Sequence, residues 1–265
     1  MNDLMLIQAA CSILEDPGIV LASLLDRMDL THWALMTKED SKLPDETFDI
    51  ADEFLLITIG ILSEKYSTEI SEISFNEELK HRLIQILVIG ERSHSEVERS
   101  VHKDCDKTLV LVEEILQEIS NLVPSKKDTT KKVYQLKKNY EEFINPFYYF
   151  VTRAQRDEID ANTFSTDFFK KPPCAKGPKL KSLFQGLSKL AWSNPLMTVF
   201  NSVFERWLQN PEKNSMLIKH LHKVIYLINI GLNNDFENKK PEFIKVFDEK
   251  GLYSTLKKVR YQFCK

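Results

Sequence analysis

The chain has 265 residues, 43% of them hydrophobic, so it can bury a core without disulfides or metal ions. Its formal net charge of −3 gives no overall attraction to nucleic acid or to an anionic membrane. The 7 glycines are too few to favour the glycine-rich phosphate loops of nucleotide-binding α/β folds. The four cysteines lie far apart and form no Cys-x-x-Cys pair, which indicates a reduced, intracellular protein rather than a disulfide scaffold.

Targeting and membrane-spanning segments are not expected. The apolar runs are far shorter than the ~20 residues that cross a bilayer, and the first apolar stretch lacks the basic flank of a signal peptide. We therefore expect a soluble protein. Because helical patterns extend to both ends of the chain, we also expect it to be a piece of a longer protein.

Residues 1–70 are predicted to form a helical N-terminal region. Apolar side chains recur at three- and four-residue spacing over Leu4–Leu14, which is typical of a helix with one buried stripe. Pro17 follows and ends that helix. The segment Phe48–Tyr66 is hydrophobic on nearly all sides, so we expect this helix at the centre of its domain.

Residues 71–150 are predicted to form a winged-helix module. A first helix is expected over 77–90, and the Ser93 to Glu96 spacing fits a capping box at the start of a short second helix. A third helix shows a clean 3.6-residue apolar period over 107–123.

A small β-hairpin follows the third helix in this prediction. Residues 126–132 form a polar turn between short extended pieces, and Val133–Leu136 has strand-type residues. An aromatic-rich segment over 140–150 then leaves the module. Three helices followed by a basic hairpin is the order of a winged helix.

The remaining chain is predicted to be helical again after a linker. Residues 151–178 begin as a polar helix and end in a proline-containing linker, and 179–265 form a C-terminal helical region. Asn194 is expected to cap a helix that begins at Pro195, and a last helix over 243–263 is expected to break at Gly251. The fold class is therefore mainly α, a helical scaffold with an embedded winged-helix module.

The charge of the module argues against the groove-reading role usual for this shape. The expected recognition helix, 107–123, has one lysine and three glutamates, a net charge of −2 that repels phosphate. The hairpin, 126–138, carries +5 and could touch a phosphate backbone, an acidic protein face, or only solvent, where lysines protect a strand edge. The hairpin residues considered as an interaction surface are Lys126, Lys127, Lys131 and Lys132.

Catalytic chemistry has no support in the sequence. No GxSxG or HExxH motif occurs. His94, His102 and Cys105 lie close in sequence but match no zinc spacing, and the pair His220 and His222 points to different faces of a helix. We expect no catalytic, cofactor-binding or metal-ligating residue in this chain.

An ordered series of short stretches carries a family resemblance. The stretches are Asp52–Ile57 with Leu62–Tyr66, Glu77–Ile84, Ser93–Val97, Phe147–Ala154, Pro172-Pro173, Leu183-Phe184 and the run from Ser215. Together they resemble the N-recognin (UBR-box) family of RING-type E3 ubiquitin ligases, in the region between the degron-reading domains and the RING. The resemblance covers roughly residues 50–232.

The resemblance implies a function for the whole family and a narrower one for this chain. Full-length members bind destabilising N-terminal residues and pass ubiquitin to lysines, which leads to proteolysis, and they use zinc-bound UBR and RING modules. This chain has no paired cysteines for zinc, so zinc is expected only in those other modules and no cofactor is expected here. The implied role is a non-catalytic scaffold that positions substrate-recognition and RING modules.

The resemblance also implies partners and a compartment. The expected partners are other domains of the ligase and a ubiquitin-conjugating enzyme, with no membrane, and the expected location is the cytoplasm, with the nucleus as a second possibility. The alternative function, from the hairpin lysines, is a nucleic-acid-binding winged helix that uses a basic wing.

Overall fold

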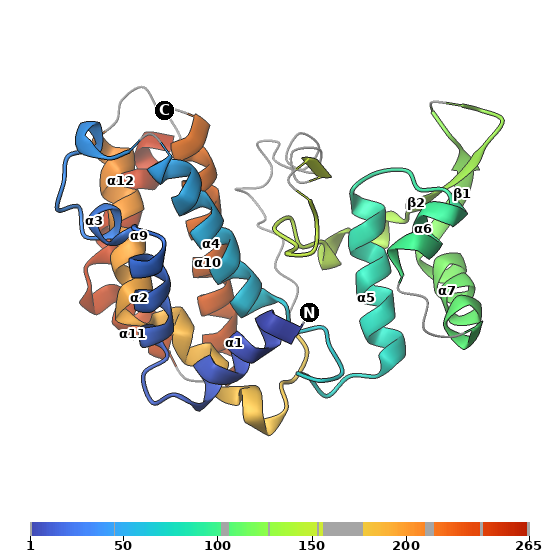
Figure 1. The fold of residues 1–265 in the computed structure, drawn as a ribbon, viewed down its shortest axis with the longest axis horizontal. Coiled ribbons are helices and arrows are strands. Elements are labelled where there is room, and N and C mark those ends of the chain that lie inside the picture. The colour runs from blue at the N-terminus through green and yellow to red at the C-terminus, as the bar shows by residue number, and fades with distance from the viewer. Residues whose placement is uncertain are drawn as a thin grey trace. The chain divides into compact units, whose positions relative to one another are not determined.

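The computed structural model describes residues 2–44, 46–101, 106–126, 128–152, 154–155, 177–209, 215–238 and 241–263. Within these ranges the chain is mainly helical, with one two-stranded antiparallel sheet, as predicted (Figure 1). It divides into two compact units. The helical unit combines Met1–Glu64 with Leu180–Lys265, and the winged-helix unit comprises Lys65–Lys179.

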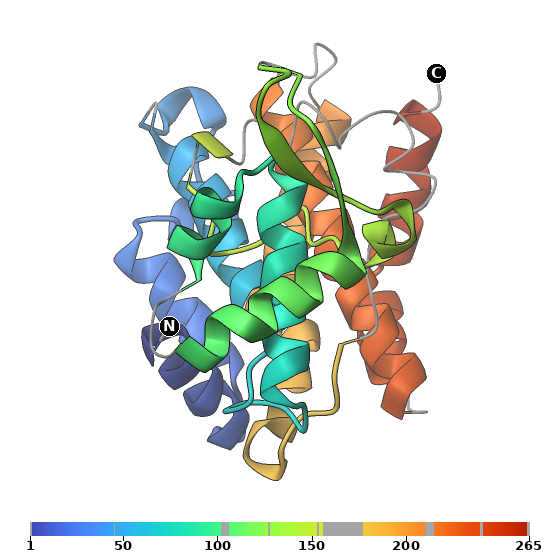
Figure 2. The same ribbon diagram turned by 90° about the vertical axis from the view of Figure 1, so that its right-hand side faces the viewer.

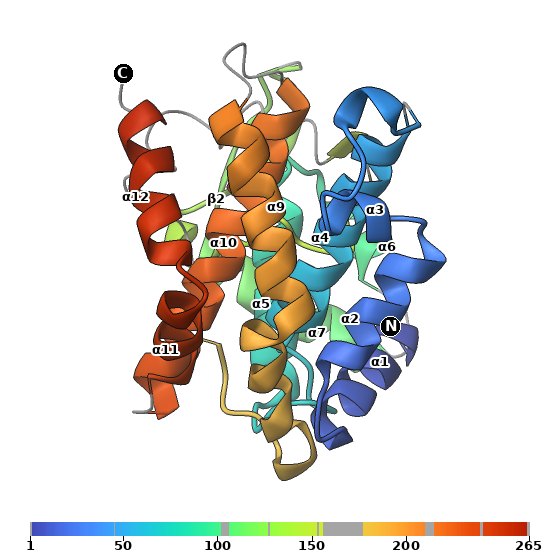
Figure 3. The same ribbon diagram turned by 90° about the vertical axis from the view of Figure 1, so that its left-hand side faces the viewer.

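The helical unit is built from both ends of the sequence. Its elements are α1 (Asn2–Ile13), α2 (Gly18–Arg27), α3 (Thr31–Ala34), η1 (Asp40–Lys42), α4 (Thr47–Ser63), η3 (Ser182–Trp192), α9 (Asn194–Gln209), α10 (Ser215–Asn238), α11 (Glu242–Glu249) and α12 (Leu252–Phe263). Helix α10 packs against both α4 and α9 (Figure 3). Ten of the seventeen residues of α4 are buried, which confirms the central helix predicted there.

Two side-chain ion pairs join the N-terminal and C-terminal parts of this unit. Asp52 of α4 accepts a hydrogen bond of 2.7 Å from Lys223 of α10, and Asp40 of η1 accepts one of 2.8 Å from Arg206 of α9. The Lys223 and Arg206 side chains are almost completely buried. The guanidinium also lies 5.2 Å from the Trp33 ring centroid. Buried cations in these positions require their carboxylate partners.

Glycines set two details of the unit. Gly186 of η3 lies directly against the backbone of Ser12, so any larger residue there would separate η3 from α1. Gly251 has a φ of +69° between α11 and α12, which confirms the predicted break. Helix α9 begins at Asn194 itself, one residue before the expected start, and the first element of the predicted C-terminal helical region is the 3₁₀ helix η3.

The winged-helix unit has the predicted order of three helices and a hairpin (Figure 2). Its elements are α5 (Phe75–Val88), α6 (His94–Ser100), α7 (Asp106–Ile119), β1 (Ser120–Pro124), β2 (Lys132–Leu136) and η2 (Lys138–Phe143). The strands pair antiparallel from Ser120 opposite Leu136 to Pro124 opposite Lys132. Arg92 adds an isolated bridge to Tyr134 on the other edge of β2.

The end of the third helix differs from the prediction. The apolar period suggested a helix to Val123, but α7 ends at Ile119 and the next five residues form β1. The backbone N–H of Lys137 donates to the carbonyl of Ile119 over 2.9 Å, so the hairpin itself supplies a partner at the helix end. Periodicity failed here because apolar residues at positions 119 and 123 suit either element.

Capping and burial explain the helices of this unit. The capping box predicted at Ser93 is confirmed, with Glu96 accepting hydrogen bonds from the Ser93 backbone and hydroxyl. A second box joins Ser74 and Glu77 at the start of α5, where the same S-x-x-E signal had been overlooked. Between them, α5, α6 and α7 bury one apolar cluster, which holds Leu79, Leu83, Ile84, Leu87, Val97, Val101, Val112, Ile115, Leu116 and Ile119.

The expected helix and linker over 151–178 lie mostly outside the described residues. At the far end of this segment, Lys179 pairs with Glu72 over 2.6 Å. Among the helices that the structure describes, none combines the length and the apolar character that crossing a membrane requires.

Candidate interaction surface of the winged-helix module

The third helix, α7, is strongly amphipathic. Its buried side packs on α5, and its solvent side presents Val110, Glu113, Glu114 and Gln117. Val110, at the start of this side, is 61% exposed. The exposed side of the expected recognition helix is therefore acidic, with the apolar Val110 at one end. We call this surface the α7 face.

The third glutamate of this helix serves the fold instead. Glu118 lies 2.5 Å from the Lys80 ammonium and accepts a hydrogen bond of 3.0 Å from the Tyr140 hydroxyl. The hydrogen bond from Lys80 is the main cause that lowers the pKa of Glu118. The Lys137 ammonium donates hydrogen bonds to the backbone carbonyls of Gln117 and Glu118. It thereby supplies donors to carbonyls of the last turn of α7 and places a positive charge at the negative end of the helix dipole.

The predicted lysine surface of the hairpin is exposed, and part of it is paired within the module. The Lys126 ammonium is 3.9 Å from Glu91, and its backbone N–H donates to the same carboxylate over 3.0 Å. The Lys131 ammonium is 3.2 Å from Asp128. Lys132 is exposed on β2, and Lys127 lies outside the described residues. These pairs reduce the charge that the hairpin offers to a phosphate backbone.

A histidine connects the α7 face to the hairpin. His94 Nδ1 lies 3.3 Å from the Tyr134 hydroxyl of β2, and its Nε2 lies 4.0 Å from Glu113 and 3.4 Å from Glu98. Burial, and then the charge of Glu113, raise the pKa of Tyr134. His94 of α6 therefore lies between the wing and α7. The other members of the metal set considered above, His102 and Cys105, lie outside the described residues.

A buried glutamine, Gln85, anchors the aromatic exit segment to α5. Its amide nitrogen donates to the carbonyl of Phe143 over 2.8 Å, and its oxygen accepts from the N–H of Asn145 over 2.9 Å. The Asn145 side chain then accepts from the N–H of Phe147 over 3.0 Å. Gln85 is not among the residues predicted from the sequence, although a polar residue among the buried apolar positions of this helix is a usable signal.

His81 lies on the same side of α5 in an aromatic pocket. Its ring stacks on Tyr66 with centroids 3.8 Å apart and meets the edge of Tyr148 at 6.2 Å. Burial lowers the pKa of His81 to about 3, so the imidazole is neutral at physiological pH. The exit segment is therefore held by a neutral polar and aromatic arrangement that acid would disrupt.

The acidic charge of the α7 face disfavours groove reading. A recognition helix in a DNA groove places its exposed side chains within reach of bases and phosphates. Here those side chains include two carboxylates, and a duplex would place phosphates beside them.

Comparison with known proteins agrees with the family resemblance found in the sequence. Residues 78–171 match a family model described as the winged-helix domain of UBR1-like E3 ubiquitin-protein ligases. The chain is 23% identical to E3 ubiquitin-protein ligase UBR1 of Drosophila melanogaster over 275 residues, which covers 97% of this chain and 15% of that protein.

Two further relatives extend the comparison. E3 ubiquitin-protein ligase ubr-1 of Caenorhabditis elegans is 23% identical over 91% of this chain and 12% of its own length. E3 ubiquitin-protein ligase UBR2 of Homo sapiens is 21% identical over 93% of this chain and 15% of its own length. This chain thus corresponds to a small part of each relative. Its winged-helix part matches the family model and most of its length is similar to UBR-type E3 ubiquitin ligases, so the resemblance predicted from the sequence is confirmed.

Proposed function

We propose that this chain is a non-catalytic interaction segment of an N-degron-pathway ubiquitin ligase that acts in the cytoplasm. Its winged helix contacts protein through the α7 face, and its packed units hold substrate-recognition and RING modules at a set separation. Such positioning raises the effective concentration of the groups that react. The supporting observation is the exposed acidic and apolar surface of Val110, Glu113 and Glu114 on a well-buried helix.

The proposed partners are another domain of the ligase or a ubiquitin-conjugating enzyme. A partner for the α7 face needs an apolar side chain opposite Val110 and basic side chains opposite the two glutamates. Electrostatic complementarity of this kind contributes to the rate and the specificity of association. Zinc belongs, in this proposal, to other modules of the ligase, and the chain itself supplies no reacting group.

A binding experiment tests the proposal. Purified chain is immobilised, and a panel of ubiquitin-conjugating enzymes and separately purified ligase domains is passed over it. We expect one of them to bind, and binding to fall at least about tenfold in Glu113→Lys/Glu114→Lys, because two attractive contacts become repulsive. The matched control is Lys131→Glu/Lys132→Glu, which changes two charges of the hairpin and leaves α7 intact.

The alternative of a nucleic-acid-binding wing is tested with the same variants. Binding of duplex DNA that falls with salt and is lost in the hairpin variant would overturn the proposal. Binding of every panel member with equal affinity by the wild type and the α7 variant would overturn it as well.

A further inference from the structure

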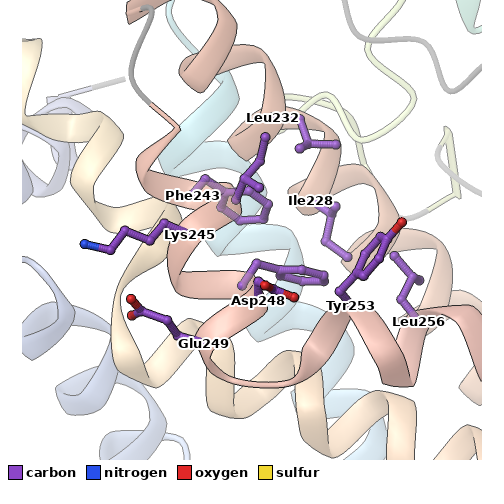
Figure 4. Close-up of a pocket in the computed structure, with 10 residues that line it drawn as sticks. Ile228, Leu232, Phe243, Lys245, Asp248, Glu249, Tyr253 and Leu256 are labelled. Carbon is purple, nitrogen blue, oxygen red and sulfur yellow. The ribbon is translucent and has the colours of Figure 1, made fainter.

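An apolar pocket of about 630 Å³ opens on the helical unit, far along the chain from the winged helix. Its volume lies within the ~300–1,000 Å³ that is typical of binding pockets. The apolar side chains that line it come from three helices (Figure 4): Ile228 and Leu232 of α10, Phe243 and Phe247 of α11, and Tyr253 and Leu256 of α12.

Local sequence explains why the pocket has this shape. Gly231 of α10 lies directly beneath the Phe243 ring, so the absence of a side chain lets α11 approach α10 there. Phe243 and Phe247 lie one turn apart with ring centroids separated by 5.4 Å, and both are buried. Gly251 then turns the chain so that α12 forms the other wall. The lining pairs recur at three- and four-residue spacing, so the pocket follows the ridges of its helices.

The rim of the pocket is also apolar and exposed. Ile244 is 44% exposed and Tyr253 is 52% exposed, and both line the opening. A small ligand inside the cavity would leave these two side chains in water. A helix laid along the pocket would cover both while it inserts apolar side chains at i, i+3 or i+4, and i+7, which is how amphipathic helices bind apolar grooves.

The charged groups at the rim determine which charge the side chains of a bound helix should carry. Asp248 and Glu249 are exposed at the end of α11, and neither forms an ion pair with another described residue. On the wall formed by α12, the Lys257 ammonium lies 4.3 Å from the Tyr253 ring centroid. That wall therefore already has a cation supplied by this chain. Figure 4 shows the Lys245 side chain projecting away from Tyr253, on the side of Glu249. The charged residues that line the pocket, Lys245, Asp248 and Glu249, sum to −1, so an occupant gains from a basic side chain beside the carboxylates.

We propose that the pocket between α10, α11 and α12 binds an amphipathic helix of a partner protein, with apolar anchors in the pocket and lysine or arginine beside Asp248 and Glu249. This binding site is separate from the α7 face and does not depend on the winged helix. It gives the helical unit an interaction surface of its own.

The test is a selection from a displayed library of helical peptides of about 18 residues, with the full 265-residue chain as target. We expect the selected peptides to share apolar residues at i, i+3 or i+4, and i+7 and to be enriched in lysine or arginine on one flank. Their affinity is then measured by fluorescence anisotropy. Ile244→Asp is expected to weaken binding at least about tenfold, because it places a charge in an apolar contact.

A charge exchange gives the sharper readout. Asp248→Lys/Glu249→Lys is expected to weaken binding about tenfold, and a peptide with glutamate in place of its basic residues is expected to recover binding to that variant. The control Ile19→Asp changes an exposed isoleucine of α2 outside the pocket and should leave the affinity unchanged. Circular dichroism and thermal melting establish that each variant is folded.

Two results would overturn the inference. One is a selection that yields no binders, or binders whose affinity is the same for wild type, Ile244→Asp and the charge-exchanged variant. The other is competition in which 1-anilinonaphthalene-8-sulfonate occupies the pocket but no helical peptide displaces it, which would mean that the site takes only small apolar molecules.

Discussion

Lys80 and Glu118 join α5 to the last turn of α7 through a contact of 2.5 Å between ammonium and carboxylate. This pair ties one acid of the recognition helix, Glu118, to α5, whereas the exposed Glu113 and Glu114 form no contact with α5 of this kind. The difference matters because a glutamate that is already paired contributes to the module, whereas an exposed glutamate is available to a partner. The acidic character predicted for the helix therefore has two separate roles.

The Lys80 and Glu118 pair is expected to contribute modestly to stability. Both side chains are partly exposed, so Lys80→Met should lower the free energy of unfolding by less than about 1 kcal/mol. The pKa of Glu118 is lowered in the folded state, so this contribution is present above the unfolded pKa and is lost as pH falls through the folded value. Urea unfolding of both proteins at pH 7 and pH 3 measures it, and an unchanged difference between the two pH values would contradict the assignment.

The Gln85 amide is expected to matter more. Gln85→Leu removes two hydrogen bonds and leaves the buried N–H of Asn145 without this acceptor, so we expect a loss of about 2–4 kcal/mol. Chemical denaturation of the winged-helix unit measures the loss. Gln117→Leu, an exposed glutamine on α7, is the matched control and should change stability by less than about 0.5 kcal/mol. Equal effects of the two substitutions would mean that Gln85 does not anchor the exit segment.

Acid is expected to destabilise the module through His81. Its folded pKa of about 3 lies below the ordinary 6.5, so the unfolded chain binds the proton more tightly and stability falls as pH drops from 6.5 toward 3. Between pH 6.5 and 5 the loss approaches about 2 kcal/mol at roughly 1.4 kcal/mol per pH unit. His81→Phe should remove this part of the loss. Burial also lowers the pKa values of His220 and His222 in the helical unit to about 4, and these two groups titrate in both proteins. A pH dependence that is the same in variant and wild type would therefore refute the role of His81.

In the ion pair between α4 and α10, removal of one partner is expected to destabilise the protein more than replacement of both partners by apolar residues. Asp52→Asn removes the carboxylate charge that faces the almost fully buried Lys223 ammonium, and should cost about 3 kcal/mol. The double variant Asp52→Leu/Lys223→Met should recover most of that loss, because no isolated charge remains. Thermal unfolding monitored by circular dichroism measures both. A double variant less stable than Asp52→Asn would show that the pair contributes more than the apolar replacement.

The fold was predicted correctly from the sequence where the apolar periodicity is long and regular. The central position of α4 and the break at Gly251 followed directly from the pattern, because one helix was apolar on all sides and one glycine interrupted another. The end of α7 did not follow. Apolar residues continue into β1 at helical spacing, and only the tertiary pairing with β2 decides the boundary.

The candidate site was predictable in its charge and not in its contacts. The acids of α7 were visible in the sequence, but the separation of Glu118 from the exposed glutamates depends on Lys80, which lies 38 residues earlier. Contacts at that separation leave no local pattern. The pocket of the helical unit was invisible for the same reason, since a helix stripe that contains Ile228 and Leu232 reads as ordinary core whether or not a groove remains above it.

The most direct test of protein contact by the α7 face is photo-crosslinking from position 117 in an intact ligase that contains this chain. The exposed Gln117 is replaced by a photoreactive residue, with Asn139 of η2 as the matched exposed control position. We predict crosslinks from position 117 to a basic surface of another ligase domain or of a ubiquitin-conjugating enzyme, and their loss in Glu113→Lys/Glu114→Lys. Crosslinks to duplex nucleic acid, or yields no higher than those from position 139, would contradict the account.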